Sequence, residues 1–197
     1  MKKIVFAFTM MMICATAVAQ TPKNVLDRTA AVVSHPGGIT AAFTMTGGMG
    51  NASGTIAVKG KKFQATSPVA TIWFDGKTMW TYMKKNDEVS ITTPSDAQLQ
   101  KINPYNFINL YKNGYDMTIS SASTTHTVHL TAQGAQKIQE LFITVDKKSF
   151  HPTQVKMLQG KRWTTFEISQ LKTVTLNDSM FTFNSKDFPK AEVIDLR

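Results

Sequence analysis

The sequence predicts a mainly β fold, a sandwich or a barrel to which a few helices are added. About eleven short segments, spaced by about ten residues, alternate apolar residues with threonine, serine or alanine. Such alternation is typical of a sheet with one buried apolar face and one face in water. The stretch from Trp73 to Tyr82 contains Asp75-Gly76, a strong signal for a two-residue hairpin turn. Together these features predict strands that are joined by short turns.

Residues 1–19 have the pattern of a cleavable secretory signal peptide. Lys2 and Lys3 precede an apolar run of about 15 residues, and Ala17-Val18-Ala19 provides a small-residue cleavage site. This run is shorter than the roughly 20 residues that a membrane-spanning helix needs. We therefore expect residues 20–197 to form a single domain in an exported protein. That domain contains no cysteine, so it must be stable without disulfides.

The domain is expected to open with a helix and to continue as strands. Thr21-Pro22 is typical of a helix start, and the apolar residues of segment 25–33 then recur at helical spacing. Alternation predicts the next strands at residues 39–45, 53–59 and 63–65, on both sides of the Asp75-Gly76 turn, and at 89–92.

Two helical signals interrupt the strands. Ser95 and Gln98 match a capping box, and Pro104 precedes a second segment, residues 105–112, which is apolar nearly all round. Such a helix is either deeply buried or partly covered by something else. Strands are expected again at residues 126–132, 141–145, 155–157 and 164–168. A last segment at 171–176 leads through Phe181 to a tail strand at 192–197.

The composition offers little catalytic chemistry. His126 and His129 lie three apart in a predicted strand and so point to opposite faces, and no cysteine could complete a metal site. The chain has no G-x-S-x-G nucleophile motif, and the flexible glycine-rich loop 47–50 precedes no helix that could hold a phosphate. We therefore expect no enzymatic activity, no metal and no cofactor. The formal charge of +9 falls to +7 without Lys2 and Lys3, and the lysines fall mostly in turns. A dispersed, solvated surface explains this charge better than nucleic-acid binding.

The predicted elements do not explain what covers the apolar face of the sheet. One long sheet with an apolar face and few helices to cover it is compatible with either a dry core or a ligand-filled cavity. The hydrophobic content of 42% is ordinary and does not decide between the two.

Several motifs resemble those of the periplasmic outer-membrane lipoprotein carriers, the LolA family. The strand Gly54-Thr-Ile-Ala-Val-Lys59 and the hairpin Asp75-Gly-Lys-Thr-Met-Trp80-Thr-Tyr82 occur in the family's order, followed by the helix Pro104 to Ile108 and the end Val193-Ile-Asp-Leu-Arg197. The resemblance implies an incomplete, strongly curved antiparallel β-barrel with a helical lid over an apolar cavity. It also implies a monomeric carrier of lipoprotein acyl chains between an inner-membrane release complex and an outer-membrane acceptor.

One position departs from the family pattern. Well-studied members have an arginine and then a proline after the lysine of the first motif, where this chain has Gly60 followed by Lys61 and Lys62. The resemblance associates that arginine with holding the lid and with one-way transfer. Lys61 supplies a charge but not the planar fork of an arginine.

The predicted cavity lining is drawn from the apolar faces of these elements, and about half of its members would be core in any version of the fold. At the Trp73 and Trp80 positions, Phe74 and Met79 compete for the inner face. The predicted lining residues are Phe43, Ile56, Val58, Phe63, Trp73, Trp80, Tyr105, Phe107, Ile108, Leu141, Ile143, Phe166 and Ile168. Carriage of a free lipid or another hydrophobic molecule, and a fixed protein partner on the apolar face, remain alternatives.

Overall fold

The computed structural model describes residues 20–95, 98–99 and 110–197. In this range the chain forms one twelve-stranded sheet and the helix α1 (Pro22–Val33). The strands are β1 (Ile39–Gly47), β2 (Ala52–Lys59), β3 (Lys62–Thr66), β4 (Ala70–Phe74), β5 (Met79–Met83), β6 (Glu88–Thr92), β7 (Tyr115–Ser121), β8 (Thr125–Ala132), β9 (Ile138–Asp146), β10 (Pro152–Gln159), β11 (Arg162–Thr173) and β12 (Glu192–Asp195).

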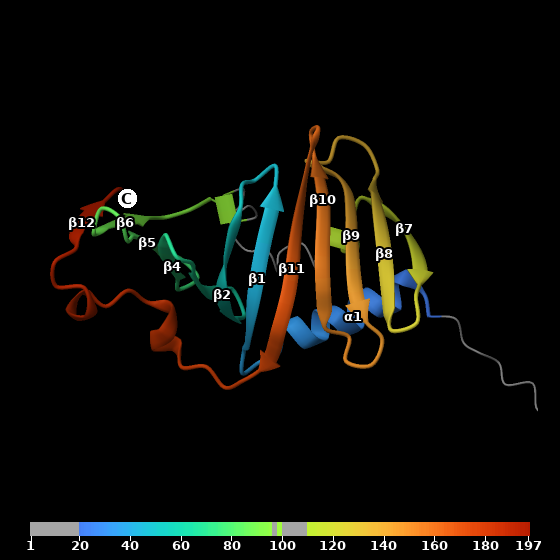
Figure 1. The fold of residues 1–197 in the computed structure, drawn as a ribbon, viewed down its shortest axis with the longest axis horizontal. Coiled ribbons are helices and arrows are strands. Elements are labelled where there is room, and N and C mark those ends of the chain that lie inside the picture. The colour runs from blue at the N-terminus through green and yellow to red at the C-terminus, as the bar shows by residue number, and fades with distance from the viewer. Residues whose placement is uncertain (1–19, 96–97, 100–109) are drawn as a thin grey trace, which may run out of the picture.

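The sheet has the order β12-β6-β5-β4-β3-β2-β1-β11-β10-β9-β8-β7, and it is not closed into a barrel. All neighbouring strands are antiparallel except β12 and β6, which run parallel. In Figure 1, β1 and β11 to β8 are seen nearly face-on, whereas the β4 to β6 end is turned away, so the sheet bends strongly. The predicted mainly β, incomplete-barrel fold is confirmed. Strand β7 is absent from the predicted elements, although Tyr115, Met117 and Ile119 alternate there with polar residues.

Helix α1 begins and ends where the sequence predicts. The Thr21 side chain accepts a hydrogen bond from the backbone N–H of Asn24 at 3.2 Å, and Pro22 occupies the first turn. Its apolar face is buried against β7 and β8 and includes Val25 and Leu26, which are fully buried. No helix in the described ranges is long and apolar enough to cross a membrane.

The concave face of the sheet carries the main core. Residues that are directly paired on neighbouring antiparallel strands point to the same face, so the register Val58–Phe63–Phe74 continues one apolar row across β2, β3 and β4. The row Val128–Ile143 does the same across β8 and β9. These residues belong to one buried cluster with α1.

The outer face of the β3 to β6 end is covered by the chain that follows β11. This C-terminal segment, residues 174–197, contains the short 3-10 helices η2 (Asp178–Phe181) and η3 (Ser185–Asp187) and ends in β12. Figure 1 shows it running from the end of β11 past β2 and β4 to β12. Phe181 is fully buried there, in a 3-10 helix rather than in a strand.

The hairpin between β4 and β5 differs in detail from the prediction. Phe74 pairs with Met79, and the Asp75 N–H donates to the Thr78 carbonyl at 3.2 Å. The tip of the turn therefore consists of Gly76 and Lys77, one residue later than predicted. Asp75 precedes the tip, and its carboxylate accepts hydrogen bonds from the Lys77 and Thr78 N–H groups at 2.8 and 2.7 Å.

Candidate functional site

The concave face contains an apolar cavity of about 300 Å³. Strands β1, β2, β3, β4 and β11 form its wall, together with the loops β1–β2 and β3–β4. The lining residues are Phe43, Met45, Met49, Ala52, Ile56, Ala65, Thr66, Ser67, Ala70, Ile72 and Phe166. The cavity thus lies on β strands away from β7 and β8, which α1 contacts.

Small residues among large ones create the cavity. Phe43 is paired with Gly54 on one side and Ile168 on the other, while Ala65 lies between Ile56 and Ile72. Where small side chains alternate with large ones, the wall retains free volume that a uniformly large set would fill. Gly54 is required for close strand packing, because a Cβ there would collide with the carbonyl oxygen of Thr66.

The β1–β2 loop places Met49 on the cavity wall. The Gly48 N–H donates to the Trp163 carbonyl at 2.7 Å, and the Met49 N–H donates to the Thr164 hydroxyl at 3.2 Å. These bonds fix the loop to β11. The sequence predicts only a flexible glycine-rich loop at residues 47–50 and does not point to Met49. Met45 is also absent from the predicted lining, although it follows Phe43 on the same face of the strand.

The structure brings three of the predicted lining residues into this cavity: Phe43, Ile56 and Phe166. Four others are buried in the main core cluster without lining the cavity, namely Val58, Phe63, Leu141 and Ile143. Ile168 is partly buried and packs against that cluster. The predicted lid residues Tyr105, Phe107 and Ile108 lie outside the described residues.

Trp73 and Trp80 require a correction, because they lie on the outer face. Trp73 makes edge-to-face contacts with Phe183 and Phe188, with ring centroids 5.6 Å apart in both cases. Trp80 is paired with Trp73 and so shares its face. Their neighbours Phe74 and Met79 occupy the inner face. Both faces of β4 are covered, so the alternation could not show which aromatic residue points inward.

At both ends of the predicted lid segment, the described part of the chain packs one residue against the core: Leu99 before the gap and Tyr111 after it. The Gln98 side chain accepts a hydrogen bond from the Ser95 N–H, as the capping box predicts. The Ser95 hydroxyl departs from that motif, because it donates to the Gln98 side chain while the Gln98 N–H donates to the Ser95 carbonyl. On the far side, Tyr111 is buried and its hydroxyl donates to Asp27 of α1 at 2.6 Å. Burial and this hydrogen bond raise the pKa of Tyr111 to about 12, so the phenol stays protonated and attaches this segment to α1.

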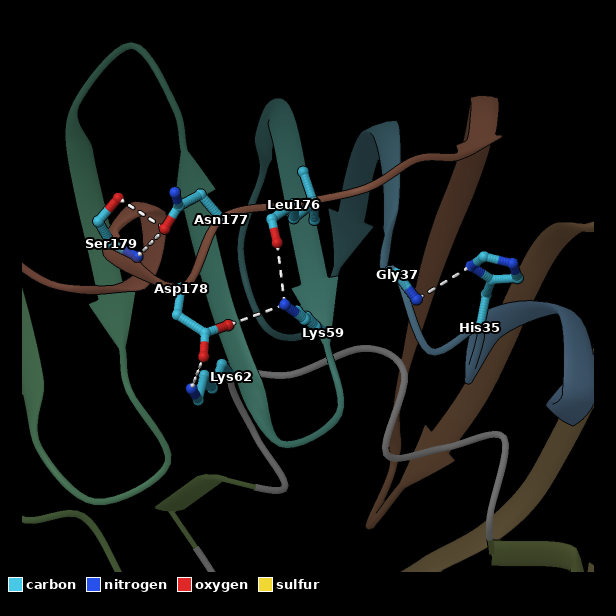
Figure 2. A network of polar contacts seen from close by, with 8 residues as sticks. All are labelled: His35, Gly37, Lys59, Lys62, Leu176, Asn177, Asp178 and Ser179. Atoms are coloured by element: carbon cyan, nitrogen blue, oxygen red, sulfur yellow. Dashed lines mark hydrogen bonds and ion pairs between the residues drawn. The ribbon is translucent and has the colours of Figure 1, made fainter.

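A charged cluster holds the C-terminal segment against the β2–β3 hairpin, next to residues 60–62, where the chain departs from the family pattern. Lys59 and Lys62 each bind one carboxylate oxygen of Asp178, at 2.9 and 2.8 Å, and Lys59 also donates to the Leu176 carbonyl at 2.9 Å (Figure 2). Gly60 has a φ of 59° in the turn between these lysines, and Lys61 is exposed. Hydrogen bonds from both lysines hold the pKa of Asp178 at about 2.

The histidines do not assemble a site. His126 is buried, whereas His129 on the opposite face stacks on Phe142 with ring centroids 4.0 Å apart, as the period of the strand predicts. Burial lowers the pKa of His126, and Lys147 adds to this effect. Among the described residues, no three or more His, Cys, Asp or Glu side chains are grouped so that they could hold a metal ion.

Known proteins resemble this chain both in sequence and in fold. A family model described as outer membrane lipoprotein carrier protein LolA matches residues 13–161. A search of curated proteins found no match. Among solved structures, an uncharacterized conserved protein from Thermus thermophilus is similar with a TM-score of 0.59 and 13% identity, covering 89% of this chain and 99% of that one.

Two further solved structures are similar at the same identity of 13%. MucB gives a TM-score of 0.50 over 83% of this chain and 63% of its own. A LolA superfamily protein from Nitrosomonas europaea gives 0.44 over 84% of this chain and 99% of its own. At such identities the likeness to the Thermus thermophilus protein and to MucB shows the shared fold.

Proposed function

This chain belongs to the family of the outer membrane lipoprotein carrier protein LolA, and we propose that it carries lipoproteins through the periplasm with their acyl chains in the concave cavity. The family has a carrier fold for hydrophobic ligands. Under this proposal the cargo comes from a release complex at the inner membrane and passes to an acceptor at the outer membrane. The carrier catalyses no reaction.

The observation that carries the proposal is the apolar cavity on the concave face. Apart from Thr66 and Ser67, its lining side chains are hydrocarbon, aromatic ring or thioether. The Ser67 hydroxyl already has partners within the β3–β4 turn. It donates to the Ala70 carbonyl and accepts from the Ala70 N–H, both at 3.1 Å. Such a wall offers few partners to a polar ligand and suits an alkyl chain.

The affinity of this cavity for acyl chains follows from desolvation. Each methylene group that moves from water into an apolar environment gains about 0.8 kcal/mol, so a few buried carbons suffice for useful binding. Met45 and Met49 are flexible and polarisable, and they can adapt to chains of different length. A carrier must also release its cargo, and moderate affinity from a small cavity meets that need.

The test is release of lipoproteins from membranes. Protein comprising residues 20–197 is incubated with spheroplasts, and the supernatant is probed for lipoproteins bound to it. We expect a soluble one-to-one complex that transfers its lipoprotein to outer-membrane vesicles bearing an acceptor. Recovery of only free fatty acid or phospholipid, shown by mass spectrometry of the purified protein, with no lipoprotein released, would overturn lipoprotein carriage and leave a carrier of free lipid.

A further inference from the structure

The methionines of the described chain have very different environments. Met157 is fully buried in the core, and Met83 and Met180 are exposed, at 39% and 38%. The remaining four, Met45, Met49, Met79 and Met117, are partly buried and pack against the concave cluster. Among all of them, only Met45 and Met49 line the cavity.

We propose that Met45 and Met49 are oxidation sites, and that their conversion to sulfoxides weakens the binding of alkyl chains in the cavity. This inference rests on the proposed function of the cavity. Both residues lie in strand or loop segments of the wall and are partly exposed. An oxidant in solution therefore reaches the thioethers of an empty cavity, whereas the buried Met157 is protected.

The chemistry needs no other group of the protein. Hydrogen peroxide transfers one oxygen atom to the sulfur, which loses two electrons, and the peroxide is reduced to water. Each oxidation converts an apolar side chain into one with a strong hydrogen-bond acceptor. Restoration requires a methionine sulfoxide reductase and its thiol reductant.

The cross-strand neighbours of Met45 and the N–H of Met49 offer the new acceptor no hydrogen bond. Met45 is paired with Ala52 on β2 and Phe166 on β11, which have no side-chain hydrogen-bond donor. The N–H of Met49 is already bonded to Thr164. An acyl chain that covers an unpaired S=O group must strip its water, which is costly. We expect binding to weaken by about tenfold for one covered sulfoxide.

The experiment measures binding of a dansyl-labelled fatty acid before and after hydrogen peroxide, in protein comprising residues 20–197. Two leucine pairs are compared, each with its own untreated form: M45L/M49L in the wall and M83L/M180L on the exposed surface. Peptide mass spectrometry quantifies each sulfoxide, and circular dichroism verifies the fold. M49L alone serves if the double variant in the wall does not fold.

Oxidation is expected to weaken binding by about tenfold or more in the wild type and in M83L/M180L, where both cavity methionines can be oxidised, and to leave the affinity of M45L/M49L nearly unchanged. Unchanged wild-type affinity with both cavity methionines oxidised would overturn the inference, as would their failure to oxidise before Met157. An equal loss in M45L/M49L would also overturn it. Absence of probe binding by the untreated wild type would instead refute the proposed function on which the inference rests.

Discussion

Filling the cavity with a protein side chain should remove acyl-chain binding without loss of the fold. Ala65 lies in the wall between Ile56 and Ile72 and is partly buried. In Ala65→Phe, the added ring takes space that about four methylene groups of a ligand would otherwise occupy. At about 0.8 kcal/mol for each, the loss is about 3 kcal/mol, or roughly a hundredfold in Kd.

The assay is a fluorescence titration with a dansyl-labelled fatty acid, combined with thermal unfolding. Ala42→Phe is the matched control, because Ala42 points to the outer face, where its partners Thr55 and Ser169 are exposed. We expect the control to bind the probe as the wild type does. A folded Ala65→Phe variant with wild-type affinity would refute the assignment of the cavity as the binding site.

Three other changes test the architecture around the cavity. Gly54→Ala should lower the free energy of unfolding by roughly 1–3 kcal/mol, because the added Cβ would collide with the Thr66 carbonyl. Denaturant unfolding measures this loss, and an unfolding midpoint equal to that of the wild type would contradict the close approach of the two strands. Asp178→Asn should be less stable than the wild type at neutral pH. The difference in stability should vanish as pH falls from about 4 to about 2, because the pKa of Asp178 is lowered to about 2 in the folded state. A difference that persists below that pH range would argue against the charged cluster. Trp73→Ala should cost about 3–5 kcal/mol of stability. It should leave the fatty-acid affinity of the folded protein unchanged, since Trp73 faces the C-terminal segment. A folded variant with weakened fatty-acid binding would show instead that Trp73 contributes to the cavity.

Most of the fold follows from local patterns in the sequence. In strands β8 and β9, buried residues such as Val128 and Ile143 alternate with more exposed ones, and this period of two indicates both the strand and its orientation. Helix α1 has its own start signal and one apolar face. The identity of the family was also accessible, because its motifs occur in order along the chain.

The site was harder to predict, since it depends on which face each strand turns inward. Trp73 and Phe74 are adjacent and both buried, because the C-terminal segment covers the outer face of β4. The alternation of residues within β4 cannot indicate that a segment about 100 residues later in the sequence covers the outer face of the strand. The cavity also depends on small residues such as Ala65, whereas the predicted lining includes only large apolar residues.

The position of bound ligand is the most direct test of the account. A fatty acid with a photoactivatable diazirine on its alkyl chain is bound to the protein and irradiated, and the attachment sites are mapped by mass spectrometry. We predict crosslinks to Phe43, Ile56 and Ile72 on the concave wall. Crosslinks confined to the outer face, at Phe142 or Trp163, would contradict the central claim that the concave cavity holds the acyl chain.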